Sequence, residues 1–167
     1  MEDYKYISSD TNVWFDFNCI SKIDLPFRMP YKYIMYKEAL RDEIISPPEL
    51  LETLVKNGLE GVGITIEEFY YAEELANKYV KLSAYDRIAL SIAKNREIIL
   101  LTGDRALRKA AEAENVTVLG TIGLLDELYN GGFITKIKYR NCLKLFKEHT
   151  ERRLPIDEID KRLNPEK

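Results

Sequence analysis

Short strand-like runs alternate with helical patterns along most of this chain, and this alternation limits its fold more than any other feature. The run Ile98–Leu101 is four unbroken apolar residues, typical of a parallel strand buried on both faces. Other strands are predicted at 4–9, 31–36, 59–65 and 116–119, and helices at 11–21, 37–45, 49–57, 66–80, 104–115, 121–130 and after Ser83. Such alternation predicts an α/β fold with a mostly parallel central sheet of about five strands and helices on both faces.

The domain organisation follows from length and pattern. With 167 residues, the chain is most simply one globular unit. We expect residues 1–133 to form the α/β domain and residues 134–167 a helical C-terminal extension packed on it, interrupted at Pro155. In the helix at 66–80, Phe69, Ala72, Leu75 and Ala76 are expected to face inward, and Glu67, Glu68, Glu73 and Glu74 outward.

Composition excludes several classes of protein. No apolar run approaches the roughly 20 residues that cross a bilayer, so no membrane partner is expected. The acidic start MEDYKYISSD is unlike a signal peptide, and a cytoplasmic protein is expected. The two cysteines, Cys19 and Cys142, lack metal-type spacing and His149 is the single histidine, which argues against a histidine triad or a zinc cluster.

The charge is unevenly distributed. The net charge is −3, but residues 133–153 carry seven Lys and Arg against two acids. A basic strip beside an acidic body can steer a polyanion toward a site. The same pattern also fits an ordinary solvated helix face, and the sequence leaves both interpretations open.

Acidic residues stand where predicted strands and helices meet. Asp10 and Asp104 each follow a strand-like run, and Asp86 lies three residues after Ser83. The carboxyl ends of parallel strands share one edge of a sheet, where ligands bind, and gathered carboxylates suit Mg²⁺ or Mn²⁺. Each acid also has a structural explanation, as a helix cap or a first-turn acid. Glu43, with Asp42 as its rival, lies on the helix after the second strand.

Four segments carry a resemblance to a known family. The segments SSDTNVW, LSAYDRIALSIAK, IILLTGDRALRKAAE and VTVLGTIGLLDELY resemble PIN-domain ribonucleases of the kind that act as toxins in VapBC toxin–antitoxin pairs. The resemblance spans about residues 5–133. It implies a catalytic and metal-binding set of Asp10, Glu43, Asp86 and Asp104, with polar support from Thr11, Asn12 and Thr102.

The resemblance also implies an activity and partners. We expect a Mg²⁺- or Mn²⁺-dependent endoribonuclease that hydrolyses phosphodiester bonds of single-stranded or structured RNA, with an antitoxin protein as a candidate partner. A homodimer is implied as well, and the crowded apolar residues Trp14, Phe15, Phe17, Ile34 and Met35 suggest surface left over for it.

Two other functions remain open. One is a catalytically silent PIN scaffold that binds RNA or protein, against which stands the complete set of four acids. The other is a phosphohydrolase with Asp10 as its nucleophile, similar to haloacid-dehalogenase-like enzymes. That family carries a second Asp two residues later, where this chain has Asn12.

Overall fold

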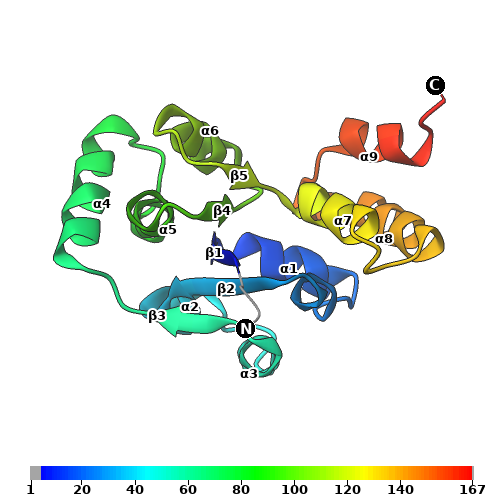
Figure 1. The fold of residues 1–167 in the computed structure, drawn as a ribbon, viewed down its shortest axis with the longest axis horizontal. Coiled ribbons are helices and arrows are strands. Elements are labelled where there is room, and N and C mark those ends of the chain that lie inside the picture. Colours follow the sequence, from blue (N-terminus) through cyan, green and yellow to red (C-terminus); the bar gives the residue numbers. More distant parts are fainter. Residues whose placement is uncertain (1–4, 167) are drawn as a thin grey trace.

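The computed structural model describes residues 5–166 and has a five-stranded, all-parallel sheet at its centre (Figure 1). Along the sheet the strand order is β3-β2-β1-β4-β5. The strands are β1 (Lys5–Ser9), β2 (Tyr31–Tyr36), β3 (Glu60–Val62), β4 (Ile99–Leu101) and β5 (Val118–Leu119). The predicted α/β class with a parallel sheet is therefore confirmed.

The middle strand, β1, is where the direction of the chain through the sheet reverses. Its neighbours are β2 on one side and β4 on the other, and all pairs are parallel. Ser9 pairs with Leu101 at the carboxyl ends of β1 and β4. In open α/β sheets this switch point, outside the carboxyl ends of the strands, is where ligands bind.

Helices cover both faces of the sheet. In Figure 1, α4, α5 and α6 lie to the left of the strands and α1, α7 and α8 to the right, while α2 and α3 lie beside the β3 edge. The helices are α1 (Asn12–Cys19), α2 (Lys37–Glu43), α3 (Leu50–Asn57), α4 (Ile66–Lys78), α5 (Ala84–Arg96), α6 (Arg105–Ala113), α7 (Thr121–Asn130), α8 (Lys136–Glu148) and α9 (Ile156–Leu163), with short 3-10 turns η1 (Leu25–Arg28) and η2 (Thr150–Arg152). Within residues 5–166, no helix is long and apolar enough to cross a membrane.

The larger core lies on the α1 side and absorbs the aromatic residues of that helix. Trp14 and Phe17 are fully buried, and the Trp14 indole Nε1 donates to Ser9 Oγ at 2.7 Å. Ile34 and Met35 are 2% and 3% exposed. The monomer already buries these four residues, and Phe15, the fifth of the group, is partly buried against the same core. The expectation that this group leaves apolar surface for a second copy is therefore wrong for all but Phe15. The homodimer stays a prediction without that support.

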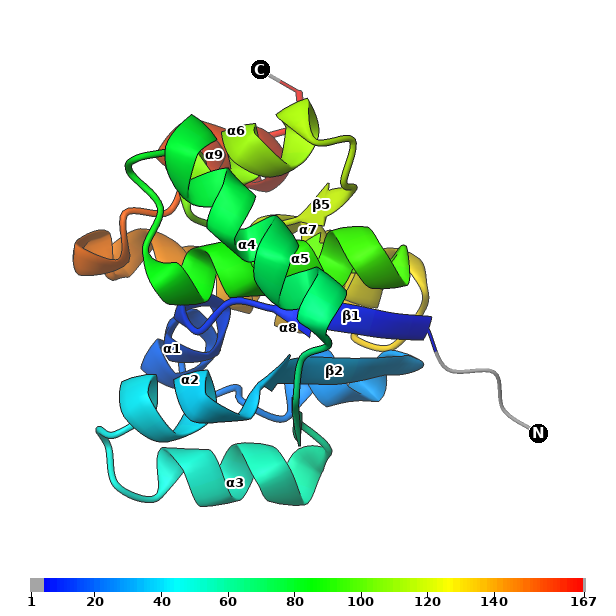
Figure 2. The same ribbon diagram turned by 90° about the vertical axis from the view of Figure 1, so that its left-hand side faces the viewer.

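The smaller core lies between the sheet and α5, which α4 covers from outside (Figure 2). Here two expectations for α4 are wrong: Glu68 is 2% exposed, whereas Phe69 is 49% exposed. The reason is the capping box at the start of α4, in which the Glu68 carboxylate accepts from the Thr65 amide at 2.9 Å. Arg96 Nε pairs with the same carboxylate at 2.8 Å, so the buried charge is neutralised.

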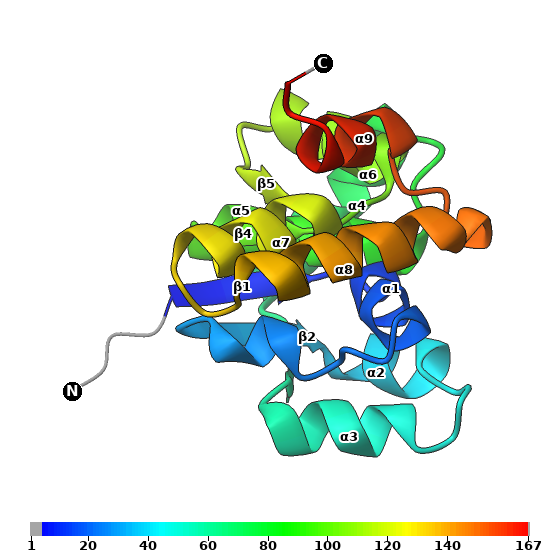
Figure 3. The same cartoon turned by 90° about the vertical axis from the view of Figure 1, so that its right-hand side faces the viewer.

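The C-terminal helices pack against the rest of the molecule (Figure 3). Phe146 of α8 is fully buried and meets Phe17 of α1 edge to face, with ring centroids 5.6 Å apart. Arg162 of α9 pairs with Asp126 of α7 at 2.8 Å, which gives Asp126 a structural role. Residues 134–166 therefore share the larger core.

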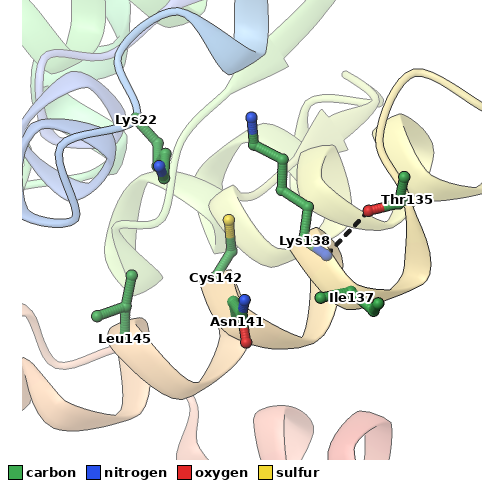
Figure 4. Close-up of a pocket in the computed structure, with 7 residues that line it drawn as sticks. All are labelled: Lys22, Thr135, Ile137, Lys138, Asn141, Cys142 and Leu145. Carbon is green, nitrogen blue, oxygen red and sulfur yellow. Dashed lines mark hydrogen bonds between the residues drawn. The ribbon is translucent and has the colours of Figure 1, made fainter.

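A shallow hollow of about 550 Å³ lies between the Lys22 turn and the first half of α8 (Figure 4). Its lining residues are Lys22, Thr135, Ile137, Lys138, Asn141, Cys142 and Leu145. The amines of Lys22 and Lys138 stand at its rim (Figure 4). The four acids predicted to form the active site do not line it.

If α8 is an integral part of the core, truncating its buried aromatic must weaken the whole fold. We expect Phe146→Ala to lower the free energy of unfolding by about 3–5 kcal/mol, the usual cost of emptying a buried aromatic site. Ile137, on the same helix, is 75% exposed, so Ile137→Ala should cost no more than about 0.5 kcal/mol. Urea unfolding of both variants measures the difference, and a loss below about 1 kcal/mol for Phe146→Ala would contradict the packing.

Candidate active site

Asp10 stands directly after β1, at the carboxyl end of the middle strand, and is 7% exposed. Its amide donates to the carbonyl of Leu101 at 2.9 Å, which extends the β1–β4 pairing by one residue. Its carboxylate accepts two further hydrogen bonds, from the Thr11 amide to Oδ1 at 2.7 Å and from Thr102 Oγ1 to Oδ2 at 2.9 Å. The side chain is therefore fixed from both neighbouring segments.

Thr102 joins the first acid to the second. It is fully buried after β4, and the oxygen that donates to Asp10 also accepts from the Asp104 amide at 3.1 Å. Asp104 then caps α6, since its Oδ1 accepts from the Leu107 amide at 2.8 Å. Its Oδ2 receives no hydrogen bond from the described residues, so the cap leaves one oxygen for a ligand.

Glu43 reaches the same place from the end of α2. Thr11 Oγ1 donates to Glu43 Oε1 at 2.7 Å, and the Glu43 charge is among the causes that raise the pKa of Asp10. Its rival, Asp42, accepts instead from Arg41 at 3.2 Å and from the Tyr85 hydroxyl. The contact with Thr11 thus places Glu43, rather than Asp42, beside Asp10.

Asp86 lies in the first turn of α5 and forms a capping box with Ser83. The helix is held against β1 by the buried Ser8, whose hydroxyl donates to the Ala89 carbonyl at 2.9 Å. Asp86 reaches the other acids by charge, because its carboxylate raises the pKa of Asp10 and its own pKa is raised partly by Asp104. The remaining Asp86 oxygen, Oδ1, receives no hydrogen bond from the described part of the chain.

Electrostatic strain is greatest at Asp10. Burial, followed by the charge of Asp86, raises the pKa of Asp10 from 3.8 to about 6, although the hydrogen bonds from Thr102 and Thr11 lower it. Burial also raises the pKa of Asp86. Within residues 5–166, none of the four carboxylates forms an ion pair with a Lys or Arg. The nearby charge of Arg87 lowers the pKa of Asp86, but burial and the other acids outweigh it, so the repulsion is only partly offset by a side-chain cation.

The structure joins some predicted residues more closely than others. Hydrogen bonds link Glu43, Thr11, Asp10, Thr102 and Asp104 in one chain. The side chain of Asn12 is outside it, since only its carbonyl is bonded, accepting from Arg152 at 3.1 Å. No three of the four acids in the described chain place carboxylate oxygens within 4.8 Å of one another. To bind one ion together, the four acids would therefore need bridging water molecules or a side-chain rearrangement.

A role at the start of a helix, the structural explanation for these acids, holds for Asp104 and Asp86 and fails for Asp10. Asp104 is a helix cap, and Asp86 belongs to a capping box. Asp10 is not a cap, because the residue at the N-cap of α1 is Thr11 and no side chain closes that end. A buried, crowded carboxylate without a capping duty is costly, so its position requires another explanation.

The sequence did not reveal the residues that fix the helices around the site. Ser8 ties α5 to β1, and the buried Asp16 of α1 accepts from Thr121 of α7 at 2.7 Å and from Arg152 of η2 at 2.7 Å. Local sequence patterns do not predict such contacts, because they join residues 81 to 136 positions apart. The sequence spacing, which argued against a histidine triad or a zinc cluster, also gave no sign that Cys19, His149 and Glu151 meet in space.

Comparison with known proteins identifies the family. A family model described as a PIN domain matches residues 6–165, so the chain belongs to the PIN domain family. PIN domains are generally nucleases and typically use a divalent metal ion. Searches of curated proteins and of solved structures find no match to this chain. The match is to the PIN domain as such, so the resemblance to VapBC toxins stays a prediction.

The raised pKa of Asp10 predicts how the metal-free fold responds to pH. Between its ordinary value of 3.8 and about 6, the folded chain binds more protons than the unfolded chain, so the free energy of unfolding falls as pH rises through this window. The full difference is worth up to about 3 kcal/mol. Asp10→Asn removes this contribution, so the free energy of unfolding of the variant should fall less steeply with rising pH.

Urea unfolding in EDTA between about pH 4 and about pH 7 measures that slope for wild type and variant. The exposed Asp157 supplies the control, since Asp157→Asn should keep the wild-type slope. Equal slopes for wild type and Asp10→Asn would contradict the buried, crowded state of this carboxylate.

Proposed function

We propose that this PIN domain is a metal-dependent endoribonuclease that hydrolyses phosphodiester bonds of single-stranded RNA. The observation that carries the proposal is the carboxylate of Asp10, buried at the switch point of the sheet beside three more acids and without a Lys or Arg partner among the described residues. A bound cation would offset this repulsion. Every donor in the set is an oxygen, which fits Mg²⁺ or Mn²⁺.

Each acid has a distinct proposed role. Asp10 and Asp104 hold the ion directly or through water, and Glu43 and Asp86 are further ligands or position water. When bound, a divalent ion lowers the pKa of a coordinated water and stabilises charge that develops on the phosphoryl group. Asp10 must lose its proton for this role, so metal affinity and activity should both rise as pH passes about 6.

The threonines keep the acids in place. Thr102 holds Asp10 and the Asp104 amide with one hydroxyl, and Thr11 holds Glu43 and Asp10 with its side chain and its amide. Both threonines are buried, at 0% and 4% exposure, so their rotamers are restricted. Such fixed support keeps reacting groups in a productive geometry.

Cations close to the acids favour a phosphate substrate. Arg105 follows Asp104, and Arg87 follows Asp86. Arg108 Nη2 donates to the Thr102 carbonyl at 3.4 Å, which places a guanidinium beside the loop between β4 and α6. These arginines supply candidate contacts to the backbone of a polyanion.

The alternative functions have weaker support. A phosphohydrolase with Asp10 as nucleophile lacks the second acid at position 12, and Asn12 does not join the hydrogen-bonded chain. A silent scaffold has no need of four acids at one edge of the sheet. A toxin role, with an antitoxin as partner, rests on the motif resemblance alone. Cleavage of a single-stranded RNA with and without Mg²⁺, beside p-nitrophenyl phosphate as a second substrate, distinguishes the nuclease from the phosphohydrolase and from the silent scaffold.

Asp104→Asn separates the capping duty of Asp104 from metal binding, because Asn caps a helix about as well as Asp. The free energy of unfolding of the metal-free protein should stay the same or rise slightly. Mg²⁺-dependent RNA cleavage should fall about a hundredfold or more, since several kcal/mol of transition-state stabilisation depend on the ion. The rise in melting temperature caused by Mg²⁺ should shrink as well. RNA cleavage at the wild-type rate by Asp104→Asn would remove Asp104 from the catalytic set and leave it as a helix cap.

Glu43 and Asp42 form a matched pair, adjacent and both exposed. Glu43→Gln should weaken Mg²⁺-dependent cleavage about 10- to 100-fold, because it removes a charge held next to Asp10. Asp42→Asn should leave the rate within about twofold, since this side chain bonds Tyr85 and Arg41 instead. Cleavage rates at several Mg²⁺ concentrations test the pair, and the reverse order of effects would reassign the fourth acid to Asp42.

A further inference from the structure

A second cluster of metal-ligating side chains lies apart from the four acids. Cys19 is the last residue of α1, His149 follows α8 and Glu151 lies in η2. The Cys19 Sγ is 3.5 Å from His149 Nδ1 and 3.6 Å from Glu151 Oε1, and these nitrogen and oxygen atoms are 2.7 Å apart. In the described chain this is the one group of three such residues whose ligand atoms lie within 4.8 Å of one another.

These distances correspond to the edges of a tetrahedral zinc site. With Zn–S of about 2.3 Å and Zn–N and Zn–O of about 2.0–2.2 Å, tetrahedral angles place sulfur about 3.6 Å from the nitrogen and the oxygen. The two sulfur edges of the cluster already have these lengths, at 3.5 and 3.6 Å. The nitrogen–oxygen edge must open from 2.7 Å to about 3.4 Å, which the Glu151 side chain, 61% exposed, has room to do.

We propose that Cys19, His149 and Glu151 form a zinc site that fastens the C-terminal segment to the end of α1. A thiolate and an imidazole select Zn²⁺ over Mg²⁺, which prefers oxygen ligands. This ion is therefore different from the one expected at Asp10. Three protein ligands leave the fourth position of the tetrahedron for a water molecule.

The position of the cluster gives the site a structural purpose. It joins residues 130 positions apart, and α1 begins two residues after Asp10. The neighbouring Arg152 already joins the same two segments, since its Nε pairs with Asp16 at 2.7 Å and its Nη2 bonds the Asn12 carbonyl. The Arg152 guanidinium pairs with Asp16 and not with Glu151, so the Glu151 carboxylate is not occupied by this neighbouring cation. Zinc would reinforce this contact from the opposite end of α1.

Cobalt titration of the whole chain, reduced and freed of metal with EDTA, tests the site through its colour. One equivalent of Co²⁺ should give the sulfur-to-metal charge-transfer band of a thiolate ligand and the visible bands of tetrahedral cobalt, and Zn²⁺ should abolish both. Cys19→Ser should lose the charge-transfer band, while Cys142→Ala should keep it, because Cys142 is buried in α8 and is not one of the three grouped ligands. His149→Gln should weaken Co²⁺ binding about tenfold or more.

Glu151 and Glu148 provide the matched carboxylate control. Glu151→Gln should weaken binding, and Glu148→Gln, exposed at the end of α8, should not. Zn²⁺ should raise the melting temperature of wild type in a concentration-dependent way, and by more than it raises that of Cys19→Ser. A wild-type protein without the charge-transfer band, or a band that survives in Cys19→Ser, would overturn the site. These readouts do not involve RNA cleavage, so they succeed or fail independently of the proposed nuclease activity.

Discussion

The burial of one carboxylate at the carboxyl end of the middle strand is the constraint on which the candidate site depends. Asp10 is 7% exposed, and its oxygens are held by the Thr11 amide and the Thr102 hydroxyl. The parallel pairing of β1 with β4 brings those two donors to the same edge, because Ser9 and Leu101 are in register. Burial and neighbouring charge raise the Asp10 pKa to about 6, so the fold holds this group in a state that a cation would relieve.

Two of the other acids serve the fold and the site together. Asp104 closes the start of α6 and Asp86 the start of α5, each through one carboxylate oxygen. The second oxygen of each is left without a hydrogen bond from residues 5–166. Capping therefore fixes the positions of these two carboxylates and also stabilises the helices. The site thus uses side chains that the fold already holds in place. Asp10 has no such duty, which makes it the costliest member of the set.

Much of this arrangement could be predicted from local patterns, because strand–helix junctions are local. The unbroken apolar run at Ile98–Leu101 and the junction acids indicated a parallel sheet and a shared edge. In α4, the capping box of Thr65 and Glu68 is local, and its spacing is readable in the sequence. The partner that neutralises the buried Glu68 charge could not be predicted, because Arg96 lies 28 residues away. The cluster of Cys19 with His149 was equally hidden, because packing of α8 against α1 creates it across 130 residues.

The central claim is that the edge of the sheet around Asp10 binds a divalent cation. The most direct measurement is anomalous X-ray diffraction from crystals of the protein soaked in Mn²⁺. This ion shares the preference of Mg²⁺ for oxygen ligands, and its anomalous scattering locates it in the map. The account predicts an anomalous peak between the carboxylates of Asp10 and Asp104, with ligand distances of about 2.0–2.6 Å to protein or water oxygens. A map without a peak at this edge, from crystals in which no neighbouring molecule covers the edge, would contradict it.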